Sequence, residues 1–248
     1  MKEKISHAQI LGVPLIRENK ERAYGIIEDM LNNGRGTRIF TPNAEILYRA
    51  TREPSLKKLL LSADMLLPDG IGVVLASRLT DSPIPCRITG IDTAEYILSL
   101  AEKNALSVYF LGGREGVAKT AAENLKKRFP RLIVAGAHHG YFSAEEKEAL
   151  ISDIASKRPQ ILFVCLGFPA QERFIAEVDG RIADLRLSMG LGGSLDVWSG
   201  NTRRAPEAIQ RWGLEWAYRL LSSPKRIKRL PYLALFSISV IRQITYKK

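Results

Sequence analysis

The residue of this chain best placed to do chemistry is an aspartate held between a proline and a glycine. Asp69 lies in the stretch Leu66-Leu67-Pro68-Asp69-Gly70-Ile71-Gly72, after a strand expected over 63–67 and before a helix expected from Gly70 to Leu79. Ligands bind at such strand ends in open α/β sheets, and a carboxylate there can take a proton from a substrate. Aspartate is also a favoured helix N-cap, so the turn alone leaves both roles open.

Four more polar or glycine-rich turns follow predicted strands at 37–40, 106–111, 161–166 and 185–189. These turns are Thr41-Pro42-Asn43, Gly112-Gly113-Arg114-Glu115-Gly116, Gly167-Phe168-Pro169-Ala170-Gln171-Glu172 and Gly190-Leu191-Gly192-Gly193-Ser194. Right-handed crossovers bring the C-terminal ends of parallel strands to one edge of the sheet. With Asp69 included, five such turns on one edge predict a nucleotide-type cleft.

Two of these turns have competing interpretations. Asn43 can cap the helix that follows it or reach a sugar hydroxyl or amide. Gly112, Gly113 and Gly116 would let backbone N–H groups approach a diphosphate at a helix N-terminus, although such turns also serve packing alone. The spacing is not the full G-x-G-x-x-G, and no clear ribose-binding acid follows it. An NAD-dependent oxidoreductase is therefore disfavoured.

Strands and helices alternate through most of the 248 residues, of which 46% are hydrophobic. This pattern predicts an α/β fold with a doubly wound, mostly parallel sheet and helices on both faces. We expect residues 1–200 to form the α/β catalytic domain and residues 201–248 to form a basic amphipathic C-terminal appendage.

The charge of the chain is concentrated in this appendage. The net charge is +11, and residues 201–248 carry eleven Lys/Arg against two Glu, or +9, which leaves +2 for residues 1–200. The apolar segment from Leu230 to Ile241 is too short to span a bilayer, but with its flanking basic residues it suits an anionic membrane surface. A helix docked on the body or on a partner subunit is the alternative. Nucleic acid is disfavoured because no recognisable binding motif accompanies the charge.

The cysteines and histidines predict no metal site. Cys86 and Cys165 form no C-x-x-C pair, and the loop residues His138 and His139 lack a third ligand at recognisable spacing. Two unpaired cysteines favour a reduced, cytoplasmic setting. The N-terminal residues lead into no apolar stretch, so we expect no signal peptide, and we expect no cofactor.

An ordered set of motifs resembles one family, the bacterial WecG/TagA/CpsF glycosyltransferases. The motifs are Thr41-Pro42-Asn43-Ala44-Glu45, Pro68-Asp69-Gly70-Ile71-Gly72, Leu111-Gly112-Gly113, His139-Gly140-Tyr141-Phe142, Gly167-Phe168-Pro169-Ala170-Gln171-Glu172, Arg204-Ala205-Pro206, Gly213-Leu214-Glu215-Trp216 and Arg219-Leu220. The resemblance covers nearly the whole chain and is closest to members that act in wall teichoic acid linkage-unit synthesis. Ala170 departs from the pattern, because many relatives have lysine there.

The resemblance implies a specific reaction. N-acetylmannosamine would pass from UDP-N-acetylmannosamine to the C4 hydroxyl of N-acetylglucosamine on undecaprenyl diphosphate, with inversion. Asp69 would be the base, and Thr41, Asn43, Arg87 and Gln171, with the adjacent Glu172, would bind substrate. The enzyme would be cytoplasmic and peripherally attached to the inner face of the bacterial cell membrane; a homo-oligomer is left open.

An inverting transfer also needs a group that stabilises the departing diphosphate. The sequence contains no Asp-x-Asp, the motif with which many glycosyltransferases hold a divalent metal. Arginines and backbone N–H groups can act in its place, and the candidates are Arg87, Arg219, Arg226 and Arg229. We therefore expect a metal-independent reaction in which the appendage closes over the site.

Two other functions stay open at this point. One is a transferase of the same family that uses another donor, such as UDP-glucose or UDP-N-acetylmannosaminuronic acid. The other is a non-catalytic, membrane-attached nucleotide sensor, which would bind UDP without turnover.

Overall fold

A six-stranded sheet is the centre of the computed structural model, which describes residues 5–221 and 230–245. All neighbouring strands pair in parallel, in the order β4-β3-β8-β7-β5-β6. The strands are β3 (Thr37–Phe40), β4 (Met65–Leu66), β5 (Ser107–Gly112), β6 (Ile133–His138), β7 (Ile161–Cys165) and β8 (Leu187–Gly190). Because every strand runs the same way, all C-terminal strand ends lie at one edge of the sheet.

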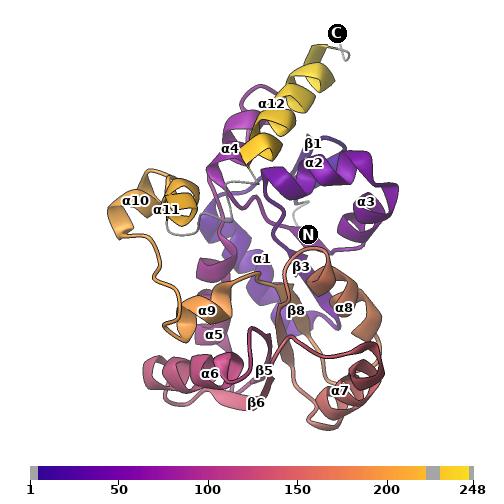
Figure 1. Ribbon diagram of the computed structural model, residues 1–248, viewed down its shortest axis with the longest axis vertical. Helices are drawn as coiled ribbons and strands as arrows, with labels where there is room; N and C mark the ends of the chain where they lie inside the picture. Colours follow the sequence, from indigo (N-terminus) through magenta and orange to yellow (C-terminus); the bar gives the residue numbers. More distant parts are fainter. Residues whose placement is uncertain (1–4, 222–229, 246–248) are drawn as a thin grey trace.

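Helices cover both faces of this sheet, each face with its own hydrophobic core (Figure 1). On one face lie α1 (Lys20–Asn33), α5 (Gly90–Lys103), α6 (Val117–Arg128) and α9 (Ser194–Trp198). On the other lie α2 (Ala44–Arg52), α3 (Pro54–Leu61), α4 (Ile71–Ser77), α7 (Ala144–Ser156), α8 (Ala170–Val178) and α12 (Leu230–Thr245). The predicted doubly wound α/β fold is confirmed.

Three local features of the fold were not predicted from the sequence. Residues 7–16 form an antiparallel hairpin of β1 (His7–Ile10) and β2 (Val13–Ile16), outside the main sheet. The strand expected over 63–67 is reduced to the two residues of β4, which lies at the edge of the sheet and pairs only with β3. His138, expected in a loop, ends β6.

The C-terminal part leaves the sheet after α9 and returns to it. The short helices α10 (Glu207–Arg211) and α11 (Glu215–Leu221) come first, and α12 then packs against α2 and α4 (Figure 1). Phe236 and Val240 of α12 are only 2% and 1% exposed and belong to the core. One side of α12 is therefore docked on the body, as one of the two interpretations of the sequence expected.

A single amide holds the C-terminal half of α12 on the β1–β2 hairpin. Gln243 Oε1 accepts a hydrogen bond from the backbone N–H of Leu11 at 2.7 Å, and Gln243 Nε2 donates to the carbonyl oxygen of Gln9 at 3.3 Å. A backbone N–H and a carbonyl at the hairpin turn thereby gain partners from a segment over two hundred residues away.

Replacing Gln243 with alanine removes both bonds. We expect the free energy of local opening of α12 to fall by about 1 kcal/mol, which speeds amide exchange in this helix about fivefold. Hydrogen–deuterium exchange measures the effect. The matched control is Ser239→Ala, since the Ser239 hydroxyl donates only to Leu235 within the same helix. Equal exchange in both variants would show that α12 is held without the Gln243 contact.

Candidate active site

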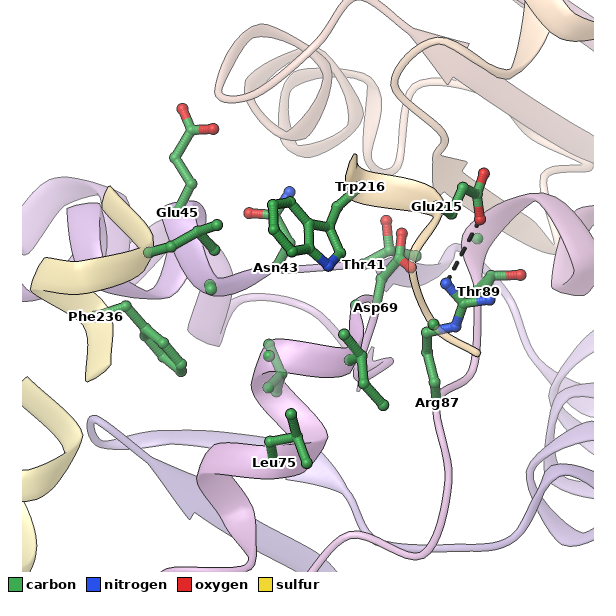
Figure 2. Close-up of a pocket in the computed structure, with 18 of the residues that line it drawn as sticks. Thr41, Asn43, Glu45, Asp69, Leu75, Arg87, Thr89, Glu215, Trp216 and Phe236 are labelled. Atoms are coloured by element: carbon green, nitrogen blue, oxygen red, sulfur yellow. Dashed lines mark hydrogen bonds and ion pairs between the residues drawn. The ribbon is translucent and has the colours of Figure 1, made fainter. Parts of the chain in front are cut away.

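A cavity of about 440 Å³ opens past the C-terminal ends of β3, β4 and β8, and α11 and α12 form its outer wall (Figure 2). Its polar lining residues are Thr41, Asn43, Glu45, Asp69, Arg87, Thr89, Ser194, Glu215 and Ser237. Its larger apolar lining residues are Ile71, Val73, Leu75, Ile91, Leu191, Trp216, Leu230, Leu233 and Phe236. This is the strand edge where the sequence predicted a cleft, and its volume suits a small-molecule site.

Asp69 faces this cavity from the turn between β4 and α4. The turn is fixed on both sides, because Leu67 N–H donates to the Phe40 carbonyl at 2.9 Å and Ile88 N–H donates to the Pro68 carbonyl at 3.2 Å. The N-cap of α4 is Gly70, whose φ of +104° disfavours an L side chain, and no side chain caps this helix. The capping interpretation of Asp69 is therefore wrong. Its half-buried carboxyl group lines the cavity.

Two predicted residues from the β3–α2 turn lie beside Asp69. The Thr41 hydroxyl donates to the Gly190 carbonyl at 3.4 Å and so ties this turn to the end of β8. Asn43 Oδ1 accepts from Ile46 N–H at 3.1 Å and caps α2. Asn43 also lines the cavity, so its two interpretations do not exclude each other.

Arg87 connects the body of the protein to the C-terminal segment. Its guanidinium group donates to the Gln210 carbonyl at 3.2 Å and lies 3.5 Å from Glu215 Oε2 (Figure 2). The side chains of Arg87 and Glu215 are only 16% and 7% exposed, so solvent screens this pair little. Thr89 caps α5 by accepting from Asp92 N–H, which places the N-terminus of that 14-residue helix at the same cavity. Positive charge and a positive helix end therefore lie on one side of the site.

Gln171 and Glu172 lie at the same end of the sheet as the cavity, but they do not line the cavity. Gln171 Oε1 accepts from Gly167 N–H at 3.2 Å and from Gly192 N–H at 2.9 Å, so this side chain joins the turns after β7 and β8. Its Nε2 donates to Glu172 Oε1 at 2.9 Å. Burial raises the pKa of Glu172, whose Oε2 has no hydrogen-bond partner among the residues that the structure describes. The contacts of Gln171 position the turn that carries Leu191 and Ser194 into the site.

The glycine-rich turn after β5 lies outside the cavity lining. Gly112 packs so closely on the Cys165 backbone that a Cβ atom there would clash with it. The Gly113 carbonyl accepts from Gly140 N–H at 2.8 Å, while Gly116 precedes α6 in the left-handed region. Packing against neighbouring strands accounts for the first of these glycines. A diphosphate contact at this turn stays a prediction.

The predicted tail arginines cannot be placed at the site. Arg226 and Arg229 lie outside the described residues, and only the backbone of Arg219, in α11, is described. Among the described residues, the tail instead contributes side chains that the sequence analysis did not assign to the site, which are Glu215, Trp216, Leu230, Leu233, Phe236 and Ser237. The stretch containing Glu215 and Trp216 was recognised as a family motif, which was the available signal.

Two searches of the described residues bear on metal and membrane. Within residues 5–221 and 230–245, no three His, Cys, Asp or Glu side chains gather closely enough to hold a metal ion. Among the helices of the described part, none is both long and apolar enough to cross a membrane.

A doubly wound sheet with a carboxylate and an arginine at one strand-end cavity is typical of enzymes that bind nucleotide-linked substrates. Residues 8–248 match the model of the glycosyl transferase WecG/TagA/CpsF family. The chain belongs to this family, as its motifs predicted, and is a glycosyltransferase.

Several relatives have the same name, N-acetylglucosaminyldiphosphoundecaprenol N-acetyl-beta-D-mannosaminyltransferase. The relative from Bacillus spizizenii is 37% identical over 212 residues, which are 86% of this chain and 81% of that protein. The Bacillus subtilis (strain 168) relative is 36% identical over 213 residues, or 86% and 82%. A Staphylococcus aureus (strain MRSA252) relative is 35% identical over 204 residues, or 82% and 79%.

The pair of Asp92 and Arg204 predicts acid sensitivity next to the site. Arg204 donates to Asp92 and fixes the segment that leads to α10. Burial alone would raise the pKa of Asp92, but hydrogen bonds from Thr89 and Arg204 outweigh it and lower this pKa. A lowered pKa contributes stability above the unfolded value of about 3.9, and this contribution is lost as the pH falls through the folded value.

Asp92→Asn should therefore destabilise the fold at pH 7 by about 1 kcal/mol and flatten the loss of stability below about pH 4. Urea unfolding at several pH values measures this difference. Glu123→Gln, on the exposed side of α6, is the control and should follow the wild type. An Asp92→Asn curve parallel to the wild type would contradict the assigned pKa direction.

Proposed function

We propose that this enzyme transfers N-acetylmannosamine from UDP-N-acetylmannosamine to the C4 hydroxyl of N-acetylglucosaminyl-diphospho-undecaprenol. The observation that carries the proposal is the presence of Asp69 and Arg87 in the lining of one strand-end cavity. The donor sugar and the acceptor come from the names of the relatives, whose matches cover more than four fifths of the chain. The product is the disaccharide lipid of a teichoic acid linkage unit.

Asp69 acts as the general base in an inverting displacement. Its carboxylate takes the proton from the acceptor hydroxyl, whose oxygen then bonds to the anomeric carbon on the face opposite UDP. The bond from that carbon to the diphosphate oxygen breaks, and its electron pair leaves with UDP. A half-buried carboxylate on a rigid turn suits this role, because its position is set before the substrate arrives.

Arg87 stabilises the negative charge that develops on the departing diphosphate. Guanidinium carries five N–H donors, so Arg87 can keep its contacts to Glu215 and Gln210 and still bind phosphate oxygens. The N-terminus of α5 adds a second positive region on the same side. We assign the same task to Arg219, Arg226 and Arg229 of the appendage, and we propose a metal-independent reaction on the strength of these cations.

The exposed side of α12 attaches the enzyme to the membrane that holds its acceptor. Leu235, Ile238 and Ile241 are 39%, 47% and 54% exposed and recur every three residues, opposite the docked side that carries Phe236. A helix that is apolar on its solvent side suits a peripheral, interfacial position. The appendage would thus be both the wall of the active site and the anchor.

Asp69→Asn tests the chemical role. We expect kcat to fall by about 10²- to 10⁴-fold, while the affinity for UDP stays within about twofold, because the amide keeps the shape but cannot take the proton. Mass analysis identifies the disaccharide lipid and calorimetry measures UDP binding. Glu45→Gln, another carboxylate on the cavity, is the matched control and should retain most activity.

The same assay separates the rival functions. A panel of UDP-glucose, UDP-N-acetylmannosaminuronic acid and UDP-N-acetylmannosamine identifies the donor, and turnover of the last one alone supports the proposal. UDP binding without any turnover would favour the sensor. Activity that disappears with EDTA and returns with magnesium would contradict the metal-independent mechanism.

Ile238→Ser combined with Ile241→Ser tests the anchor. Each substitution removes about 1–2 kcal/mol of apolar burial, so binding to anionic lipid vesicles should weaken at least tenfold in co-sedimentation. Activity in detergent should be unchanged, since neither residue lines the cavity. Ile133→Ser, a 45% exposed isoleucine on β6 far from α12, is the control (Figure 1). If the double variant binds vesicles as strongly as Ile133→Ser, this face of α12 is rejected as the anchor.

A further inference from the structure

The cavity has two chemically different halves. Asp69, Arg87, Thr89 and Glu215 make one side polar and charged (Figure 2). The other side is formed mainly by apolar side chains from α4 and α12, with Leu75 and Phe236 on opposite helices, although Glu45 lies on the same side as Phe236 and Ser237 of α12 also lines the cavity. The outer wall of this half also includes Leu230 and Leu233. The substrates that together fill this cavity must therefore offer polar or anionic groups to one half and an apolar part to the other.

Leu75 is the clearest sign that the apolar half receives a ligand. It projects from α4 into the cavity and is 49% exposed, although its helix packs on the body through Val73 and Val74, which are 0% and 2% exposed. Across the cavity, Trp216 of α11 is 46% exposed. Two large apolar side chains that line a cavity and stay half-exposed form a surface that an apolar ligand would cover.

A nucleotide sugar does not explain this half. Its uracil, riboses, phosphates and sugar offer hydroxyl, carbonyl and anionic groups, which match the polar side of the cavity. A polyprenyl diphosphate differs, because its hydrocarbon chain begins directly at the phosphate. The apolar half begins beside the polar one, and its α12 wall continues into the exposed face of Leu235 and Ile238.

We infer that the apolar half, between Leu75 of α4 and Leu233 and Phe236 of α12, binds the isoprene units nearest the diphosphate of the lipid acceptor. The inference rests on the proposed function and adds a subsite to it. The apolar half is only part of a cavity of about 440 Å³, so it accommodates only a short length of chain. The remainder of the lipid then leaves along α12 towards the membrane. The enzyme thus recognises the lipid chain of the acceptor as well as its sugar.

Leu75→Gln tests this subsite in detergent micelles, where membrane attachment is not measured. Two acceptors are compared, GlcNAc-diphosphate with a polyprenyl chain and GlcNAc-diphosphate with a methyl group. For the polyprenyl acceptor, we expect kcat/KM to fall about tenfold in the variant. The methyl acceptor and the KM for the donor should be unchanged. Leu79→Gln is the matched control, since Leu79 lies four residues further on, just after the end of α4, is 56% exposed and is outside the cavity lining.

Equal losses for both acceptors, or no loss for either, would overturn the inference. So would an equal loss in Leu79→Gln, which would indicate a general surface effect. Failure of the proposed function would give a different result, because the wild-type enzyme would then transfer no sugar to any acceptor. In that case, calorimetry with farnesyl diphosphate decides: about tenfold weaker binding to Leu75→Gln supports the subsite, and equal binding rejects it.

Discussion

The contact of Arg87 with the C-terminal segment is the interaction on which this active site depends. It joins the segment between α4 and α5 to Glu215 and to the Gln210 carbonyl, which lie 128 and 123 residues later in the chain. Both charged side chains are largely withdrawn from water, so removing one partner would leave the other buried and unpaired. This pair holds Trp216 over the strand ends and turns an open sheet edge into a cavity. The cation that we propose for the leaving group is therefore also the one that ties the C-terminal segment to the body.

The parallel sheet explains why much of the site could be predicted from the sequence. Alternating strands and helices imply that the strands run parallel. Parallel strands bring every C-terminal turn to one edge of the sheet, whatever the details of packing. Thr41, Asn43, Asp69 and Arg87 were predicted in this way or through the family motifs, and all four line the same cavity. Asp69 required the structure to exclude capping, because the local sequence of the turn favours a helix cap over a base.

The remaining part of the site depends on long-range contacts that no local pattern encodes. Glycines at 112 and 113 resemble a phosphate loop, but Gly112 also permits close packing on Cys165 and Gly113 on Val117, and the sequence does not distinguish these uses. Gln171 was expected to touch substrate, whereas its hydrogen bonds hold two neighbouring turns. The apolar wall from Phe236 could not be predicted, because the same helix is apolar on both sides and its docked side is fixed only by tertiary packing.

The two halves of the cavity and the exposed side of α12 support the proposal that the enzyme works at the membrane that holds its acceptor. Its central claim is that Asp69 takes the proton of the acceptor hydroxyl inside this cavity. The most direct measurement is a structure of the complex with UDP and the acceptor, from which the distance between the Asp69 carboxylate and the C4 hydroxyl is read. The account predicts about 2.6–3.2 Å. A hydroxyl group bound beyond the reach of Asp69, and next to another base, would contradict it.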